Sequence, residues 1–243
     1  MSEQKRIKLK IQSIDPTKWW GDDFDVRFFL ISQLKEIRNK MILDIGGGIG
    51  IICSEMDKSN FRVNLDRSFN DLRICITKVD PEIQNVCASM MHLPFKKNVF
   101  QNVICSNVLE IAKSIDFNSK SNEDSDENFV YPTIDNTLQE SKRVLDENGT
   151  LFITTPNNAY YNSNKLTFED LKNITKKIFS YVELSFYNTY PKFCRTNRKL
   201  NMAIMLPKIR SKFSDTDGVI KGLNHKQTKN NYSVSFFLKA KYK

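Results

Sequence analysis

The chain has 243 residues, of which 40% are hydrophobic, so it can bury a sizeable core, and we expect one domain over residues 1–243. Its first ten residues are polar and basic, and no run of about 18 uncharged apolar residues follows, so neither a secretory leader nor a membrane-spanning helix is expected. The five cysteines are widely spaced and form no C-x-x-C pair, which argues against a metal site or a disulfide framework and favours the cytoplasm.

The positive charge is concentrated in the last fifth of the chain. The formal net charge is +9, and residues 192–243 hold 13 Lys and Arg against 2 Asp and Glu. The first 191 residues hold 24 basic and 26 acidic side chains. This distribution predicts an attached basic surface rather than a basic catalytic centre.

Residues 1–40 are expected to form an N-terminal helical cap. Within 24–40, apolar residues recur at spacings of three and four, which is typical of one face of a helix; they are Phe24, Phe28, Ile31, Leu34 and Ile37. Trp19 and Trp20 stand just before this helix. They serve either as a lid over a ligand or, as is commoner for such a pair, as a packed anchor.

Short apolar runs follow, namely MILDI (41–45), FRVNLD (61–66), NVCAS (85–89), VFQNVICS (99–106) and TLFITT (150–155). Their apolar residues are nearly continuous, which indicates strands buried on both faces. Helices are predicted over 133–149, with Asn148 and Gly149 as a C-terminal stop, and over 166–179. This alternation predicts an α/β fold with a doubly wound, mostly parallel sheet.

A glycine-rich turn, ILDIGGGIG (42–50), contains four of the 8 glycines. The first strand-to-helix turn of such a sheet lies closest to a nucleotide-like ligand, and glycine permits positive φ angles and close contact with the backbone there. A dinucleotide site has the spacing G-x-G-x-x-G, which would require glycine in place of Ile51. Gly46, Gly48 and Gly50 instead form G-x-G-x-G after Asp44, so the turn does not favour NAD.

At these residues the chain resembles the class I S-adenosylmethionine-dependent methyltransferases, and within them the small-molecule, type 11-like enzymes. Five motifs carry the resemblance in order over residues 41–157: Asp44 to Gly50, Asp66, SMMHLPF (89–95), ICSNVLE (104–110), and RVLDENG (143–149) followed by LFITTPN (151–157). Ser89 departs from the family's acid, and the Asn148-Gly149 turn is an imperfect match. The resemblance implies a Rossmann-like sheet of seven strands, ending in a strand at 181–188 and a final antiparallel strand at 232–243.

The resemblance also implies a site for S-adenosylmethionine, formed by Asp44, Gly46, Gly48, Gly50, Asp66, Arg67, Ser89, Met90 and Asn107. Asp66 is the principal candidate, because an ionised carboxylate can accept strong hydrogen bonds from both ribose hydroxyls. Gly46 and Gly48 would let the backbone pass beside the tail and ribose of the cofactor. Asp44 would orient the turn or the ammonium of the tail.

Other residues near this site have two readings each. Ser89 either accepts from the adenine amino group or is an ordinary turn residue, while Met90 is expected to pack against adenine. Asn107, after the fourth strand, is a candidate catalytic residue, although asparagine also satisfies backbone groups there. His92 is a second catalytic candidate; the alternative is that it is an ordinary surface or loop histidine. Asp66 itself could merely cap the helix that begins near Ser68.

The implied chemistry is SN2 transfer of a methyl group to O, N or C, with alignment and desolvation supplying most of the catalysis. The sequence after strand four matches neither the Asn/Asp-Pro-Pro-aromatic motif of amino-group methylation nor a Pro-Cys nucleophile. The motif style favours a small or lipid-like acceptor. The alternatives are an RNA or protein methyltransferase that docks through its basic region, and a non-catalytic methyltransferase-like binding protein.

Two segments exceed a minimal version of this fold. Residues 113–131 are acidic and rich in Ser and Asn, so they are expected to form a flexible loop, either a lid or a disordered insert. Residues 189–231 are expected to be a basic insertion between the last two strands. Within it, 192–231 could bind nucleic-acid phosphates, contact an anionic membrane peripherally or, as we favour, cover the acceptor pocket.

Overall fold

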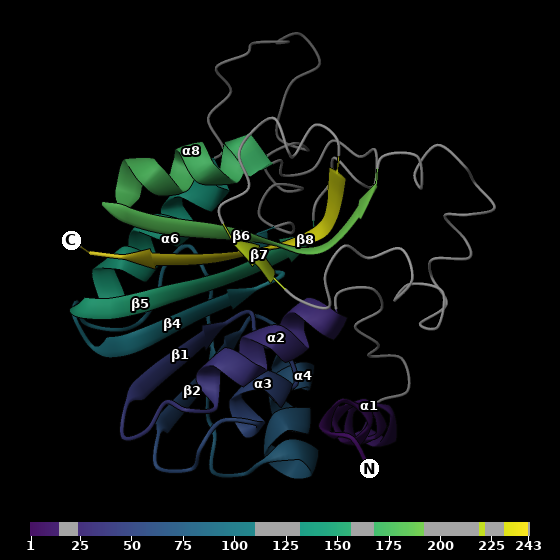
Figure 1. Cartoon of the computed structure of the whole chain (residues 1–243). Coiled ribbons are helices and arrows are strands. Elements are labelled where there is room, and N and C mark those ends of the chain that lie inside the picture. The colour runs from purple at the N-terminus through teal and green to yellow at the C-terminus, as the bar shows by residue number, and fades with distance from the viewer. Residues whose placement is uncertain (15–23, 110–131, 157–167, 192–218, 222–230, 243) are drawn as a thin grey trace, which may run out of the picture.

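A computed structural model describes residues 1–14, 24–109, 132–156, 168–191, 219–221 and 231–242. Its centre is one sheet with the strand order β3-β2-β1-β4-β5-β8-β6-β7 (Figure 1). The strands β3, β2, β1, β4 and β5 are parallel, and β8 lies antiparallel between β5 and β6. The predicted α/β fold with a mostly parallel, doubly wound sheet and an antiparallel final strand is confirmed.

The strands are β1 (Met41–Ile45), β2 (Phe61–Asp66), β3 (Gln84–Cys87), β4 (Phe100–Ser106), β5 (Leu145–Pro156), β6 (Tyr181–Pro191), β7 (Val219–Lys221) and β8 (Asn231–Lys241). The helices are α1 (Glu3–Ile14), α2 (Phe24–Leu34), α3 (Ile51–Ser54), α4 (Phe69–Ile74), α6 (Pro132–Val144) and α8 (Phe168–Ile178), together with the π-helix η2 (Cys75–Val79). Strands β1 and β2 have the bounds that their apolar runs predict.

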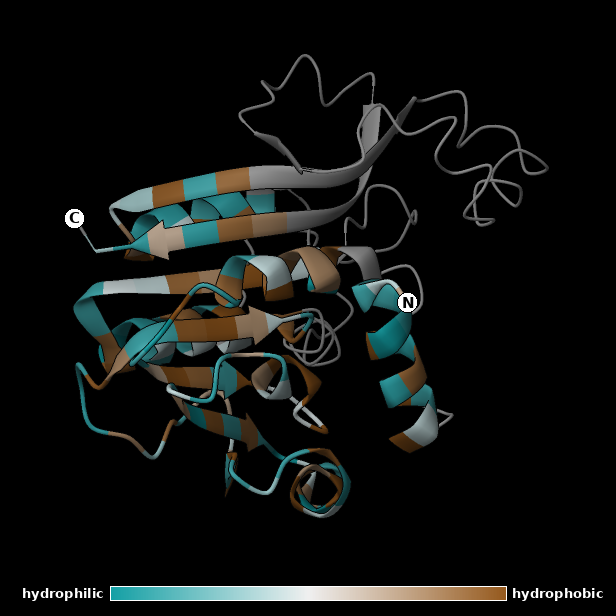
Figure 2. Cartoon of the chain, turned by 60° about the horizontal axis from the view of Figure 1, so that its bottom comes forward, coloured by the Kyte–Doolittle hydropathy of each residue, from teal (hydrophilic) through white to brown (hydrophobic). Residues whose placement is uncertain are grey.

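Alternate residues of the central strands enter two separate cores, one on each face of the sheet. In β1, Leu43 and Ile45 pack with the apolar residues of α6 and α8, whereas Ile42 packs with those of α1, α2 and α3. Figure 1 shows α6 and α8 on one side of the sheet and α2, α3 and α4 on the other. Figure 2 shows the central strands as mostly hydrophobic, which agrees with burial on both faces.

The helix predicted over 133–149 ends earlier than expected. Helix α6 ends at Val144, and Leu145 already pairs with Phe100 in the sheet. The register then shifts so that Asn102 pairs with Thr150. Residues 146–149 form a bulge of β5 between these two pairs, and Asn148 N donates to Asp146 Oδ1 at 2.9 Å. The stop signal at Asn148 and Gly149 therefore belongs to a bulge within β5, because Leu145 is buried in the sheet rather than on the helix.

An eighth strand adds to the seven that were expected. Strand β7 pairs antiparallel with β6 at the edge of the sheet. It falls inside the predicted insertion 189–231, whose first residues belong to β6 and whose last belongs to β8. The segments 192–218 and 222–230 of that insertion, the acidic loop 113–131, and Trp19 and Trp20 lie outside the described residues.

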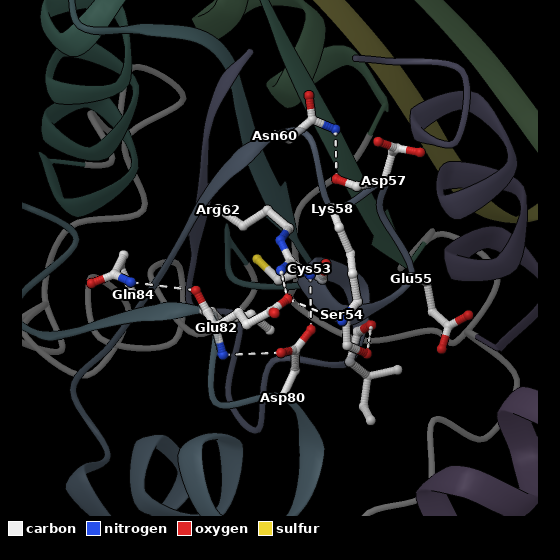
Figure 3. A network of polar contacts seen from close by, with 12 residues as sticks. Cys53, Ser54, Glu55, Asp57, Lys58, Asn60, Arg62, Asp80, Glu82 and Gln84 are labelled. Carbon is white, nitrogen blue, oxygen red and sulfur yellow. Dashed lines mark hydrogen bonds and ion pairs between the residues drawn. The ribbon is translucent and has the colours of Figure 1, made fainter. Parts of the chain in front are cut away.

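A buried ion pair joins the start of β2 to the segment after η2. It lies at the opposite end of β2 from Asp66. The Arg62 side chain is 3% exposed, and its Nη1 lies 2.9 Å from Asp80 Oδ2. Burial alone would raise the pKa of Asp80, but the backbone N–H of Glu82 and the Arg62 guanidinium hold it below its ordinary value. Figure 3 shows this network joining β2 to the segment after η2.

Candidate functional site

The predicted cofactor residues gather at the carboxyl ends of β1, β2 and β4, where ligands bind in open parallel sheets. The glycine turn leaves β1 and is fastened to β2, because Gly46 N and Gly47 N both donate to Leu65 O, at 2.7 and 3.3 Å. Gly50 ends the turn as the residue before α3. The loop therefore stands beside the end of β2, where Asp66 lies.

Three glycines of this turn have positive φ angles, namely Gly46 (69°), Gly48 (55°) and Gly50 (75°). A Cβ on Gly46 would lie 2.5 Å from Val108 Cγ2, and one on Gly50 would lie 2.4 Å from Cys75 Sγ. Among the described residues, a Cβ on Gly48 would meet nothing closer than Asp71 Oδ2 at 4.0 Å. The backbone at Gly48 is therefore the part of the turn that other atoms can approach.

The Asp66 carboxylate faces the glycine turn rather than the α4 helix. Its Oδ2 accepts from Gly48 N at 2.9 Å, and its Oδ1 accepts from Ser68 N at 2.8 Å. Ser68 itself caps α4, because its hydroxyl accepts from Asp71 N at 3.3 Å. Each Asp66 oxygen uses one lone pair in these bonds and retains another, so the half-buried carboxylate can accept from two further hydroxyls.

Asp44, in contrast, is fully buried under the turn. Burial raises the pKa of this carboxyl to about 7, with the positive charge of Arg27 opposing the shift and the negative charge of Asp66 adding to it. Its only described hydrogen-bond donor is the thiol of Cys53, at 3.9 Å from Oδ2. Asp44 is thus placed to support the turn from below rather than to touch a ligand above it.

The residues after β3 lie beside Asp66, because Cys87 pairs with Asp66 and Ala88 N donates to Asp66 O. Ser89 is exposed, and its hydroxyl accepts from Met91 N at 3.2 Å. Met90 packs partly against the core on the α6 side. Arg67 is exposed after β2.

His92 is exposed, and its backbone N–H donates to Ser89 O. The pKa of Glu140 of α6 is lowered, chiefly by its hydrogen bond with Arg143 and least by the charge of His92. Arg143 of the RVL motif holds the same loop by donating to Leu93 O and Phe95 O. The described hydrogen bond of His92 is thus with Ser89 and its electrostatic effect is on Glu140, and neither involves the glycine turn.

Asn107 follows β4 next to the turn and has a positive φ of 56°. Its backbone N–H donates to Thr154 O, and Thr154 Oγ1 donates to Asn107 Oδ1 at 3.1 Å. Ser106 Oγ lies 2.9 Å from the same Thr154 hydroxyl. This relay fixes the carboxamide, and among the described residues its buried Nδ2 meets no acceptor. Asn107 Nδ2 is therefore an unsatisfied hydrogen-bond donor near the glycine turn.

Three residues of this region were missed from sequence: Arg27, Asn64 and Thr154. Asn64 Nδ2 donates to Gly48 O at 2.9 Å, so it holds the turn directly. The available signal was a polar side chain inside an apolar strand, two residues before Asp66. Arg27 and Thr154 gave no comparable signal, because their roles depend on the packing of α2 and on the pairing of β4 with β5. Across the described ranges, no group of three or more His, Cys, Asp or Glu could hold a metal ion.

This sheet order and glycine turn define the class I methyltransferase fold. Residues 43–153 match the family model described as a methyltransferase domain, which is the resemblance that the motifs indicated. An uncharacterised protein of Methanocaldococcus jannaschii is 38% identical over 80 residues, which are 32% of this chain and 33% of that protein. The match thus spans about a third of that relative's length.

Solved structures with the same fold are distant in sequence. A possible histamine N-methyltransferase from Thermotoga maritima has a TM-score of 0.56 at 13% identity, with 98% of this chain and 100% of that chain covered. Phosphoethanolamine N-methyltransferase 2 of Haemonchus contortus, in complex with S-adenosyl-L-methionine, has a TM-score of 0.54 at 17% identity, covering 99% and 57%. The [4+2]-cyclase SpnF has a TM-score of 0.55 at 14% identity, covering 94% and 84%.

Proposed function

We propose that the chain binds S-adenosylmethionine over the glycine turn and transfers its methyl group to O, N or C of a small or lipid-like acceptor. The observation that carries this proposal is the Asp66 carboxylate, which bonds to Gly48 N and keeps acceptor capacity on both oxygens. The open space beside the Gly48 backbone fits a ligand that lies against the turn. Neighbours with this fold that are named as methyltransferases support the same reaction.

The residues present fit the cofactor in chemistry as well as in place. Asp66 would accept from the two ribose hydroxyls, the backbone at Gly46 and Gly48 would lie beside the tail, and Ser89 and Met90 would face the adenine. Arg67, exposed next to Asp66, would lie at the same side of the base. When bound, the cofactor supplies an electrophilic methyl group on a sulfonium, which needs alignment more than acid or base help.

Asn107 is the residue that we propose for the acceptor side of the site. Because the Thr154 hydroxyl fixes Asn107 Oδ1, the carboxamide presents N–H rather than C=O. A donor in this position favours an acceptor molecule with a carbonyl, hydroxyl or carboxylate near the atom that is methylated. His92 stays a secondary candidate, since its described interactions are a hydrogen bond with Ser89 and an electrostatic effect on Glu140 of α6.

The location of the protein and its macromolecular partners are proposed from the sequence alone. The cysteine pattern favours the cytoplasm, and none of the described helices is long and apolar enough to span a membrane. Docking of nucleic acid or of a membrane through 192–231 concerns residues that are mostly outside the described part of the chain.

Calorimetric titration with S-adenosylmethionine and S-adenosylhomocysteine tests the proposal. The wild-type chain is expected to bind both, and Asp66→Asn is expected to lose at least about tenfold in affinity, because the charged acceptor of the diol is lost. Glu147→Gln is a matched control, since Glu147 is an exposed carboxylate in the bulge near the start of β5, at the opposite end of the parallel strands from Asp66. Equal affinities for wild type and Asp66→Asn would overturn the assignment. Binding without methyl transfer to any acceptor would favour the binding-protein alternative.

A further inference from the structure

A row of polar side chains crosses three neighbouring strands beneath the glycine turn. In the parallel register, Asp44 of β1 pairs with Asn64 of β2, and Asn64 pairs with Asn85 of β3. Asp44 and Asn64 are both fully buried. A polar row in the interior of a parallel sheet is costly unless every group is hydrogen-bonded, so its bonds indicate what it does.

Asn64 uses both hydrogens of its carboxamide. Its Nδ2 donates to Gly48 O at 2.9 Å and to Asn85 Oδ1 at 3.0 Å, and Asn85 Nδ2 donates in turn to Ile83 O at 2.8 Å. These bonds fix the orientation of the Asn64 carboxamide. Its Oδ1 must therefore point away from Asn85, toward β1.

One oxygen of Asn64 and one of Asp44 border the same small space under the turn, since a Cβ on Gly47 would lie 2.2 Å from Asn64 Oδ1 and 2.7 Å from Asp44 Oδ2. Within the described residues, Asn64 Oδ1 and Asp44 Oδ1 have no hydrogen-bond partner, and Asp44 Oδ2 has only the 3.9 Å contact with the Cys53 thiol. Two acceptors cannot satisfy each other, but a single proton on the Asp44 carboxyl makes that group a donor.

The surrounding charges do not remove this conflict. Five described titratable groups interact electrostatically with Asp44, and each comes from a different packed element. They are Arg27 of α2, Cys53 of α3, Asp66 of β2, Cys75 of η2 and Cys105 of β4. Burial outweighs the positive charge of Arg27 and raises the pKa of Asp44 to about 7. The neutral form is thus available at and below neutral pH.

We propose that Asn64 is the positioning residue of the glycine turn, and that Asp44 supports it as a neutral acid whose O–H donates to Asn64 Oδ1 while Asn64 Nδ2 donates to Gly48 O. Ionised Asp44 would repel Asn64 Oδ1 and so loosen the bond that holds Gly48. The effect on cofactor affinity rests on the proposed function, whereas the protonation of Asp44 and its effect on stability are independent of it.

The first test is denaturant unfolding of the wild type and of Asp44→Asn across pH. A group whose pKa is raised on folding stabilises the fold below its unfolded pKa, here 3.8, and loses that contribution as pH rises to about 7. The unfolding equilibrium constant of wild type, relative to Asp44→Asn, is therefore expected to rise about tenfold per pH unit over this interval. The asparagine variant keeps an N–H donor toward Asn64 and has no proton to lose.

A constant ratio across this interval would overturn the inference, because Asp44 would then titrate alike in the folded and unfolded chains. Asn85→Ala is a matched control. It removes a bond of Asn64 without changing the Asp44 side, so it should lower stability equally at every pH.

The second test is the affinity for S-adenosylhomocysteine at about pH 6 and pH 8. Wild type is expected to lose roughly tenfold in affinity at the higher pH, since about a tenth of the chains then keep neutral Asp44, while Asp44→Asn stays level. Any protonation change of the ligand affects both proteins equally, so it cancels when wild type is compared with Asp44→Asn. A wild-type affinity that rises with pH more than that of the variant would contradict the inference. If neither protein binds, the proposed function fails, and the unfolding ratio alone decides whether Asp44 carries the proton.

Discussion

Two carboxylates of the site, Asp44 and Asp66, differ because of their surroundings. Asp66 receives two backbone N–H bonds at the end of β2, whereas Asp44 has one weak thiol contact and is fully buried. Sequence placed both at the site through the motif that carries them. It left open whether Asp44 orients the turn or the ammonium of the tail, because that choice depends on Asn64, which meets Asp44 only through strand register.

At the residue scale, two adjacent threonines of β5 provide a test of the relay that holds Asn107 and a control for that test. Both are fully buried, but only Thr154 bonds to Asn107 Oδ1 and Ser106 Oγ, and among the described residues Thr155 Oγ1 has no partner. Thr154→Val is expected to destabilise the chain by about 1 to 3 kcal/mol, because it leaves buried polar groups unpaired. Thr155→Val is expected to be neutral or stabilising. Urea unfolding measures both, and equal losses would show that the relay does not hold Asn107.

At the scale of elements, apolar runs located the strands well where both faces of the sheet are covered. The runs at 41–45 and 61–66 coincide with β1 and β2, since continuous burial leaves few alternatives for such segments. The end of α6 was misplaced because Leu145 suits a helix face and a strand equally. Only the pairing of Leu145 with Phe100 decides between them, and pairing is not local information.

The buried Arg62–Asp80 pair gives a prediction at this scale. Among the described residues, Asp80→Asn leaves the buried Arg62 guanidinium with only its 3.4 Å pair to the exposed Glu82 carboxylate, so a loss of about 3 kcal/mol in unfolding free energy is expected. Lys58→Ala breaks only the exposed pair with Glu82, whose side chains are 73% and 57% exposed, and should cost less than about 1 kcal/mol.

The cost of Asp80→Asn should also depend on pH. Because the pKa of Asp80 is lowered in the fold, its stabilising contribution is present above 3.8 and is lost as pH falls through the folded value. The difference between wild type and Asp80→Asn should therefore shrink at acid pH. Urea unfolding that gave the same difference in acid as at neutral pH would contradict this account.

At the scale of the whole molecule, the last strand completes the sheet from its interior. Strand β8 lies between β5 and β6, with Phe237, Leu238 and Ala240 buried, and Tyr242 Oη donates to Lys142 O at 2.6 Å. Deleting 231–243 is expected to unpair two strands and cause loss of fold or aggregation, detectable by circular dichroism and sedimentation. Lys241→Ala, at an exposed position, should leave both signals unchanged. A soluble, folded deletion variant would contradict this role of β8.

The fold could be predicted almost entirely from sequence, whereas the acceptor could not. The glycine turn and Asp66 have local signatures that physical chemistry ties to a nucleotide-like ligand. The acceptor side depends on Asn107 and on its relay through β5, while the predicted acidic loop 113–131 and most of the predicted basic region 192–231 lie outside the described residues. The same fold occurs in proteins named as methyltransferases and in a [4+2]-cyclase, so architecture alone does not select a reaction.

The most direct measurement is a crystal structure of the chain grown with saturating S-adenosylhomocysteine. The account predicts that both ribose hydroxyls lie within hydrogen-bond distance of the Asp66 carboxylate, with the tail of the ligand along the backbone at Gly46 to Gly48. A ligand held elsewhere, or a turn without ligand while Asp66 contacts only Gly48 N and Ser68 N, would contradict it.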